Sequence, residues 1–349
     1  MKVLQVVDPL QSNQHIHLLT SHLKKYVSIT QSVEMFFQNK EDYVIIHIHW
    51  PEELFYWKLP NAENYNLIKK RLTQWKRRAK IVYTFHNDQS HELQNYWCSS
   101  IYQAVYDAAD VIIHLGDHSY NNEIGKSPDK QHVVIPRGLY EVDNKLDNQE
   151  QARELLGLMP ESFTVLVFGK IRSQRERDFI WKTFKKISKK NKFLLVPRWY
   201  GGTYPSWKIS PLKRIQAILL DHRADKHPNT FLGRGAVAEE DIEKYFKASD
   251  IILLPRENHL NSGVLFMAYS YGKQVVAYDK AGNIGGVINE GSKYCFHNYK
   301  SYEAAYIINN LHDSDFKVIP NTDYFMTWEE IGRKTYSLYQ SILQDEVYR

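Results

Sequence analysis

The sequence predicts an α/β protein built from two parallel-sheet halves. Short apolar segments rich in Val, Ile and Leu alternate with helical segments along the chain, a pattern typical of a parallel sheet covered on both faces. The alternation stops at the polar segment 141–150 (EVDNKLDNQE), which we interpret as a linker, and then begins again. A chain of 349 residues also exceeds a typical single core, which favours two domains.

The first half predicts a Rossmann-like domain over residues 1–145. KVLQVV opens the chain as a short buried strand. Continuous apolar runs predict further strands at 43–50, 80–86, 110–115 and 132–136. The segments between them predict helices at 13–25, 61–77, 90–108 and 117–124.

The second half repeats the pattern over residues 151–320. QARELLG predicts a helix closed by Gly157, and another helix is expected at 239–249. Strands are expected at 163–169, 193–197, 230–233, 250–255 and 274–278. Residues 327–349 are expected to form a terminal amphipathic helix, capped by Thr327, that packs back on the first domain.

Composition narrows the class of protein. The 43% hydrophobic and 24% charged content is ordinary for a globular protein. Cys98 and Cys295 lie far apart in the sequence, so neither a disulfide framework nor a Cys-based zinc site is visible. Residues 1–10 lack a long apolar segment, and no run of about 18 apolar residues occurs. The sequence therefore predicts a cytoplasmic protein that does not span a membrane.

Positive charge is concentrated in two segments, 69–80 (KKRLTQWKRRAK) and 182–192 (KTFKKISKKNK). They are either solvated helix faces or surfaces attracted to anionic lipid headgroups or a pyrophosphate-bearing acceptor. Nucleic acid is disfavoured, because the net charge is only +5 and no nucleic-acid motif appears. A dinucleotide oxidoreductase is also disfavoured, because no G-x-G-x-x-G follows the first strand.

The segment 250–279 carries the clearest functional signal. An apolar strand ends at Pro255, a polar loop follows, and Asn261-Ser262-Gly263 opens an apolar helical stretch that stops at Gly272. The first N–H groups of a helix are unpaired and its dipole favours negative charge there. Small residues also let a phosphate approach the backbone. The segment therefore predicts an anion-binding site.

The order and spacing of several motifs resemble the GT-B glycosyltransferases, specifically the bacterial cell-surface polysaccharide group that uses nucleotide sugars. The resemblance covers nearly the whole chain and rests on YTFHNDQSHE (83–92), IPRGLY (135–140), FGKIRSQRE (168–176), GAVAEEDIEKYFKASDIILLP (235–255) and 272–279. It implies an N-terminal acceptor domain and a C-terminal donor domain that face each other across a cleft. It also implies transfer of a sugar from a nucleotide diphosphate to a lipid-linked or oligosaccharide acceptor.

The chain departs from the family pattern at the donor helix. Many retaining members carry a pair of glutamates where this sequence has His259 and Met267. Asn261-Ser262-Gly263 instead matches a subset with Asn/Thr-Ser-Gly at the helix entry. Arg137 replaces a frequent His, and Lys170 a frequent Arg. Two alternatives therefore stay open: a nucleotide-sugar epimerase or hydrolase, and a non-catalytic nucleotide-sugar-binding protein.

The resemblance assigns donor residues to two loops. Lys170 and Arg175 follow the strand 163–169 and would neutralise the departing pyrophosphate without a metal, with Arg172 and Arg177 nearby. The loop before the donor helix would contact the donor sugar. Its Glu257 is the nearest carboxylate to the first of the two absent glutamates and is expected to be catalytic; a solvated loop is the alternative. The phosphate-binding residues are expected to be Gly169, Lys170, Arg175, Asn261, Ser262, Gly263 and Val264, and the donor-sugar residues Arg256, Asn258 and His259.

Three histidines and one acidic pair were considered as catalytic or metal-binding residues. His86 ends a strand, and is either a base or hydrogen-bonding group at the reacting centre or a structural histidine. His47 and His49 share one face of a strand, but no third ligand has clear metal spacing. Asp313-Ser314-Asp315 resembles an Asp-x-Asp metal motif, but its late loop position predicts a turn. We therefore expect no metal and no cofactor besides the nucleotide-sugar substrate.

Overall fold

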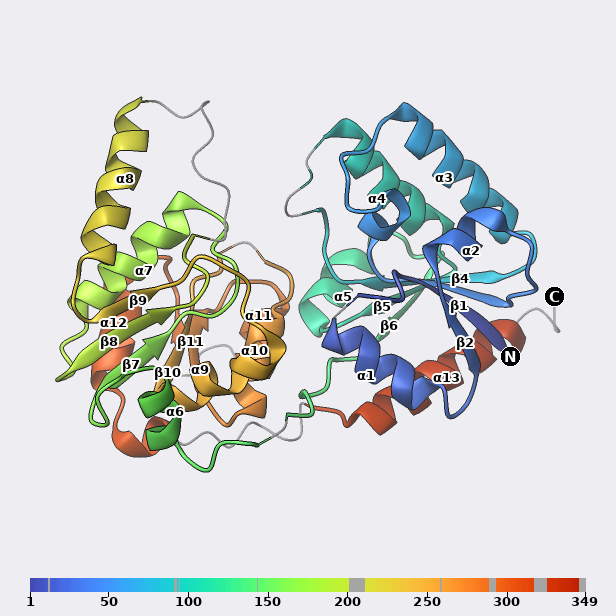
Figure 1. Ribbon diagram of the computed structural model, residues 1–349. Helices are drawn as coiled ribbons and strands as arrows, with labels where there is room; N and C mark the ends of the chain where they lie inside the picture. Colours follow the sequence, from blue (N-terminus) through green and yellow to red (C-terminus); the bar gives the residue numbers. More distant parts are fainter. Residues whose placement is uncertain are drawn as a thin grey trace. The chain divides into compact units, whose positions relative to one another are not determined.

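The computed structural model describes residues 1–11, 13–90, 93, 95–142, 144–200, 211–257, 259–288, 293–316 and 325–344. The chain divides into two compact units (Figure 1): the first runs from Met1 to Tyr140 and takes in the C-terminal helix, and the second begins at Glu141. Each unit holds one six-stranded sheet, and all neighbouring strands in both sheets are parallel. The predicted pair of parallel-sheet halves is thus confirmed.

The first unit has the strand order β2-β1-β3-β4-β5-β6. Its elements are β1 (Lys2–Val6), α1 (Gln14–Leu23), β2 (Ser28–Gln31), α2 (Val33–Gln38), β3 (Ile45–Ile48), the 3₁₀ helix η1 (Pro51–Phe55), α3 (Ala62–Trp75), β4 (Lys80–Phe85), α4 (Tyr96–Ala108), β5 (Val111–His114), α5 (Asp117–Glu123), β6 (Gln131–Val134) and α13 (Trp328–Gln344).

The C-terminal helix α13 packs beside α1 on one face of the first sheet, and α2, α3 and α4 lie on the other face (Figure 1). Tyr336 of α13 stacks on Tyr26, with ring centroids 5.1 Å apart. A Cβ on Gly332 would lie 3.1 Å from the Cβ of His22, so the glycine allows the close approach of the two helices. The prediction that the terminal helix returns to the first half is confirmed.

The second unit has the strand order β12-β11-β10-β7-β8-β9. Its elements are α6 (Gln149–Leu155), β7 (Phe163–Leu166), α7 (Gln174–Lys186), β8 (Lys192–Val196), α8 (Pro211–Asp225), β9 (Thr230–Leu232), the 3₁₀ helix η2 (Glu239–Asp241), α9 (Ile242–Ala248), β10 (Ile251–Leu254), α10 (Gly263–Ser270), β11 (Gln274–Tyr278), α11 (Asn283–Ile288), β12 (Cys295–Phe296), α12 (Ser301–Asn310) and the 3₁₀ helix η3 (Asp313–Phe316).

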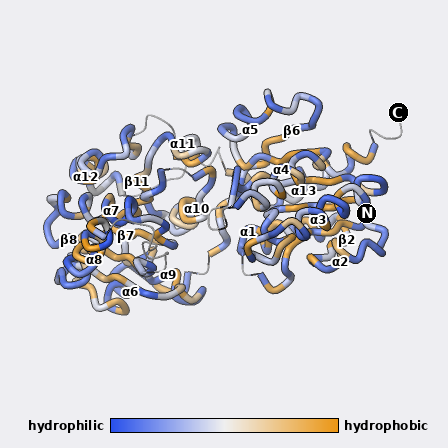
Figure 2. The backbone as a smooth tube through the Cα atoms, turned by 90° about the horizontal axis from the view of Figure 1, so that it is seen from above, coloured by the Kyte–Doolittle hydropathy of each residue, from blue (hydrophilic) through white to orange (hydrophobic). Residues whose placement is uncertain are grey.

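The second sheet is covered on both faces, by α7, α8 and α12 on one side and by α9, α10 and α11 on the other (Figure 1). All four residues of β10 are buried, which explains why this strand is a continuous apolar run. Along the helices, hydrophobic and hydrophilic residues alternate (Figure 2), as expected when only one side of a helix meets a sheet. No described helix is long and apolar enough to cross a membrane.

Two edge strands, β2 and β12, were not predicted from the sequence, and one helix start was misplaced. β2 (SITQ) lies at an edge and is half-exposed, so it shows no apolar run. β12, at an edge of the second sheet, is only two residues long. Helix α4 begins at Tyr96 instead of residue 90, because the side chain of Asn95 accepts a hydrogen bond from the N–H of Cys98 and caps the helix there.

Candidate functional site

The predicted donor residues lie at the carboxyl edge of the second sheet, where its connections diverge. β7 is flanked by β10 and β8, and the chain leaves β7 and β10 towards opposite faces of the sheet. Open α/β sheets bind ligands in the crevice formed at such a switch point. Residues 167–173 follow β7, and residues 255–257 and 259–262 follow β10. The structure therefore places the predicted phosphate loop beside the described part of the predicted sugar loop.

Gly169, in the loop after β7, lies beside the first turn of helix α10. Its φ is +88°, a conformation that favours glycine, and a Cβ there would lie 3.2 Å from Cγ2 of Val264 in the first turn of α10. Two of the residues predicted to hold the phosphates are therefore neighbours. The glycine permits both the turn and the approach.

Gly169→Ala should weaken nucleotide binding, because the left-handed backbone and the contact with Val264 both oppose a Cβ. Gly157 is a matched control: its φ is +65°, but a Cβ there would meet nothing within 4 Å. Each alanine should cost roughly 1–2 kcal/mol of backbone strain, but only Gly169→Ala should lower UDP affinity, by about tenfold. Calorimetric titration of both variants checks this, and equal UDP affinity in the two would contradict it.

Arg256 is held in a buried ion pair. Its Nη1 donates to both carboxylate oxygens of Glu176, at 2.7 and 2.8 Å, and its Nη2 donates to the backbone oxygen of Lys170 at 2.8 Å. Arg256 and Glu176 are both almost fully buried. Arg256 thus ties the start of α7 to the Lys170 backbone. This geometry favours a supporting role for Arg256 over the predicted contact with the donor sugar.

Arg175 forms a more exposed pair with Glu257. Its Nη2 lies 2.5 Å from the carboxylate of Glu257, its side chain is 66% exposed, and its guanidinium lies 5.2 Å from the Tyr299 ring centroid. Exposed pairs are worth little, about 0–1 kcal/mol. An anionic ligand can therefore displace Glu257 from Arg175 at small cost. The structure brings together the predicted phosphate ligand and the predicted catalytic carboxylate.

The loop that enters α10 is braced by α11. The amide of Asn283 donates to Asn261 Oδ1 at 2.9 Å, and its backbone N–H donates to the oxygen of Leu260. A Cβ on Gly282, whose φ is +55°, would lie 2.7 Å from the Cα of Leu260. Ser262 is the N-cap of α10 and makes no side-chain capping bond. His259 Nε2 lies 2.5 Å from Arg172 Nη1, and Asn258 lies outside the described residues.

A second polar group lies at the carboxyl edge of the first sheet. His49 follows β3 and His86 follows β4, and His49 Nδ1 lies 3.2 Å from His86 Nε2. Trp50 stacks on His86 at a centroid distance of 4.3 Å, and His15 of α1 meets His86 edge-on at 5.1 Å. β1 and β3 flank the switch point of this sheet. His15 comes after β1 and His49 after β3, and His86 follows the neighbouring strand β4.

The histidines of this group are held neutral. Burial lowers the pKa of His15, of His49 and of His86 well below the ordinary value, and the charge of Arg137 lowers the pKa of His15 and of His86 further. One ring nitrogen from each of the three histidines lies within 4.8 Å of the others. Neutral imidazoles suit zinc, but the positive charge of Arg137 opposes a cation. The group fits a neutral or anionic substrate better.

Two residues considered above as metal ligands, His47 and Asp315, have structural partners instead. His47 is fully buried, with Tyr339 at 2.6 Å from Nδ1 and Thr84 at 2.7 Å from Nε2, so it has a structural role. Asp315 lies in η3, pairs with Lys293 and accepts the N–H of His312, as the predicted turn requires. Sequence reasoning missed His15, which no local motif marks, and Glu176, whose only signal is a position three residues after the N-cap Ser173.

No protein-family model and no curated protein matches the sequence. Solved structures do match. HepE of Anabaena, in complex with UDP and glucose, has a TM-score of 0.64 at 16% identity over 100% of both chains. Sucrose-phosphate synthase from Thermosynechococcus elongatus has a TM-score of 0.67 at 14% identity over 99% of both chains. UDP-GlcNAc 2-epimerase from Methanocaldococcus jannaschii has a TM-score of 0.55 at 9% identity over 97% of this chain and 99% of that chain.

These comparisons establish the fold. The chain matches GT-B proteins over nearly its whole length and theirs, with two parallel sheets of six strands each. The predicted GT-B architecture is therefore confirmed. The identities are too low to carry activity or site residues from one chain to another.

Proposed function

We propose that this protein is a glycosyltransferase that moves a sugar from a nucleotide diphosphate to a lipid-linked or oligosaccharide acceptor in surface-polysaccharide synthesis. The observation that carries the proposal is the contact between the loop at Gly169 and the first turn of α10, braced by Arg256. The UDP and glucose in the HepE structure, on the same fold, support a nucleotide-sugar donor.

The donor site is proposed to work without a metal on the diphosphate. Lys170, Arg175 and the N–H groups at Asn261, Ser262, Gly263 and Val264 would hold the phosphate charge. His259 and Glu257 would contact the donor sugar, with Glu257 freed from Arg175 when the phosphates bind. In the first unit, the ring of His86 would accept a proton from the acceptor or hydrogen-bond a reacting oxygen.

Two alternatives keep the same donor site. An epimerase or hydrolase is favoured by the likeness to UDP-GlcNAc 2-epimerase, and a non-catalytic binding protein is favoured by His259 and Met267 at the glutamate positions. An epimerase or hydrolase converts the nucleotide sugar without an acceptor. A binding protein binds it without turnover.

A nucleotide-sugar screen followed by an acceptor assay tests the proposal. UDP-, GDP- and other nucleotide sugars are first compared by thermal shift, since a ligand at 100 times its Kd adds about 2.7 kcal/mol of stability. The sugar that stabilises is then incubated with a panel of acceptors, with and without EDTA. We expect turnover that needs an acceptor and persists in EDTA. Acceptor-free turnover, or activity restored only by Mn²⁺ or Mg²⁺, would contradict the proposal.

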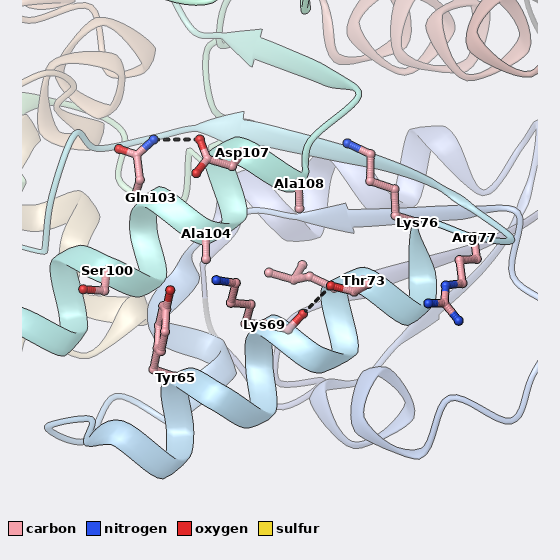
Figure 3. A pocket seen from close by; sticks show the side chains of 11 residues that line it. Tyr65, Lys69, Thr73, Lys76, Arg77, Ser100, Gln103, Ala104, Asp107 and Ala108 are labelled. Carbon is pink, nitrogen blue, oxygen red and sulfur yellow. Dashed lines mark hydrogen bonds between the residues drawn. The ribbon is translucent and has the colours of Figure 1, made fainter.

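A basic groove between α3 and α4 supports contact with an anionic membrane or lipid-linked acceptor (Figure 3). It has a volume of about 550 Å³. Its three cationic side chains, Lys69, Lys76 and Arg77, are exposed, and its one carboxylate, Asp107, accepts a hydrogen bond from Gln103. By contrast, two lysines of the other basic segment donate to backbone oxygens: Lys189 to Leu311 after α12, and Lys192 to Phe184 and Ile187 at the end of α7. The groove is therefore the stronger candidate for anionic lipid.

The triple variant Lys69→Gln/Lys76→Gln/Arg77→Gln should bind phosphatidylserine vesicles on the order of a hundredfold more weakly at low salt, since each basic residue near an anionic surface adds about 1 kcal/mol. Vesicle co-sedimentation measures this, and high salt should release the unmodified protein. The control is Lys182→Gln/Lys185→Gln/Lys186→Gln, which removes the same charge from α7. Equal binding to neutral and anionic vesicles would favour the solvated-face interpretation.

A further inference from the structure

The turn after η1 holds two aromatic residues in a backbone conformation that such residues rarely adopt. Tyr56 and Trp57 have φ of +53° and +55°, in the left-handed region that is costly for a bulky side chain. The N–H of Tyr56 donates to the backbone oxygen of Glu53, and the N–H of Trp57 donates to that of Glu52. Backbone strain of this kind often occurs at functional sites, and here it holds two rings at the surface.

Four large apolar side chains are exposed in this turn and at the start of α4. Their exposed fractions lie between 53% and 74%. They are Tyr56, Trp57, Leu59 and Tyr96. The two segments are joined at Pro60, whose backbone oxygen accepts a hydrogen bond from the side chain of Asn95, the N-cap of α4, at 2.8 Å.

The exposed rings of α4 continue into the basic groove. Tyr96 meets Trp97 edge-on, with ring centroids 4.9 Å apart, and the rings of Trp97 and Tyr65 have a centroid distance of 5.7 Å. Tyr65 lines the groove together with Lys69 (Figure 3), whose Nζ lies 5.7 Å from the Tyr65 ring centroid. We call the following six residues the aromatic rim: Tyr56, Trp57, Leu59, Tyr65, Tyr96 and Trp97.

The shape and charge of the aromatic rim fit a membrane surface. Its most exposed members project into solvent, whereas sites for small molecules are usually concave. Trp and Tyr are enriched where proteins meet the headgroup layer of a membrane, because their rings combine an apolar body with a polar edge. The segments 56–59, 62–69 and 95–97 contain Lys58 and Lys69 but only one carboxylate, Glu63, and the adjoining groove adds Lys76 and Arg77. The combined surface is therefore apolar and cationic.

We propose that the aromatic rim inserts into the headgroup layer of an anionic membrane while the basic groove binds the anionic headgroups. The inference rests on the proposed function, in which the acceptor is carried by a lipid, and adds an apolar contact to the electrostatic one. Salt screens the groove, and a single weak membrane signal gives only reversible binding. The two contacts together hold the first unit at the surface that carries a lipid-linked acceptor.

Vesicle co-sedimentation of the full chain at low salt tests the aromatic rim. Trp57→Gln/Tyr96→Gln should bind phosphatidylserine vesicles on the order of tenfold more weakly, since two exposed rings no longer leave water on binding. Trp57→Phe/Tyr96→Phe should keep most of the affinity, because an apolar ring remains at both positions. The control is Tyr302→Gln/Tyr306→Gln, at two exposed tyrosines of α12 in the second unit, and it should bind as the unmodified protein does.

The salt dependence of binding separates the two contacts. The Gln variant of the aromatic rim should keep the ratio of low-salt to high-salt affinity, whereas the triple variant of the basic groove should lose most of it. Vesicles of phosphatidylserine brominated on the acyl chains should quench part of the tryptophan fluorescence of the bound protein. Trp57→Phe/Trp97→Phe should still bind but should lose most of this quenching.

Three results would overturn the rim assignment. They are equal vesicle affinity in Trp57→Gln/Tyr96→Gln and the unmodified protein, quenching that Trp57→Phe/Trp97→Phe retains, and absence of vesicle binding by the unmodified protein. Methyl glycosides that bind the unmodified protein but not the Gln variant would assign the surface to sugar instead. An unchanged urea midpoint for exposure of Cys98, buried in the first unit, shows that the variants are folded.

UDP titration of the same samples separates this inference from the donor site. The rim variants should bind UDP as the unmodified protein does, because the aromatic rim lies in the first unit and the proposed donor site in the second. Absence of UDP binding would refute the donor site and leave the vesicle result standing. Weaker UDP binding in the rim variants alone would contradict a role confined to the membrane.

Discussion

At pH 5.5 the first unit should be several kcal/mol less stable than at pH 7.5, while the second unit changes much less. Burial lowers the pKa of five histidines of the first unit, to about 3 for His47 and for His114, and well below the ordinary value for His15, His49 and His86. The unfolded chain binds protons at these rings below about pH 6.5, and the native state does not. Stability is therefore retained above pH 6.5 and falls as the pH decreases towards the native pKa.

The expected loss is large because several rings contribute. At pH 5.5, one unit below 6.5, each histidine ring that stays neutral in the native state lowers the free energy of unfolding by about 1.4 kcal/mol. The five rings together would remove on the order of 7 kcal/mol, a large part of a typical stability of 5–15 kcal/mol.

The two cysteines allow each unit to be followed separately. Cys98 is buried in the first unit and Cys295 in the second, and both are free thiols. The protein is equilibrated in urea at each pH and is then labelled with a brief pulse of thiol reagent at one fixed pH. Mass spectrometry reports the urea concentration at which each cysteine becomes exposed. We expect the Cys98 midpoint to fall at pH 5.5 and the Cys295 midpoint to move less. His17→Gln is the control, because it removes an exposed histidine of α1. This variant should show the same difference in Cys98 midpoint between the two pH values as the unmodified protein. A Cys98 midpoint that is the same at both pH values would contradict neutral buried histidines.

Arg256→Met should destabilise the second unit by about 3–5 kcal/mol, because it leaves the carboxylate of Glu176 buried without its charged partner. The double variant Arg256→Met/Glu176→Met should recover most of this loss, since two apolar side chains need no pairing. UDP affinity should stay low even in the double variant, because the bond from Arg256 to the Lys170 oxygen is absent.

Arg175→Met is the matched control for Arg256→Met. It breaks the exposed pair with Glu257 and should cost only about 0–1 kcal/mol. The Cys295 labelling midpoint measures both variants, and Cys98 serves as the internal reference. If Arg256→Met and Arg175→Met shifted the Cys295 midpoint equally, Arg256 would not brace the donor site.

The fold was largely predictable because buried parallel strands are continuous apolar runs. Every residue of β10 is buried, and its sequence IILL shows this directly. β2 was not predictable, because an edge strand with half-exposed polar residues has no such run. The two-residue β12 depends on its pairing with β11, which no local pattern reveals.

The site was predictable only where its residues are local in sequence. Gly169 and Val264 were each assigned to the phosphates from the motif around them, and their approach became visible only in the structure, where β7 and β10 are neighbours. The pair Arg256–Glu176 spans 80 residues and has no local signature, so Arg256 was assigned to the sugar. His15 joined His49 and His86 only through the placement of α1 beside the strand ends.

Calorimetric titration of UDP into the protein and into Arg175→Ala tests the central claim most directly. A charge-assisted contact is worth roughly 1.5–3 kcal/mol, so removal of the Arg175 guanidinium should weaken UDP binding about tenfold to a hundredfold. Because the side chain is exposed, the variant should fold normally. Arg177→Ala is unsuitable as a control, since that guanidinium is buried against Asp221; Lys182→Ala, exposed on α7, serves instead. The account predicts one UDP site, weakened only in Arg175→Ala. Absence of UDP binding, or equal affinity in both variants, would contradict it.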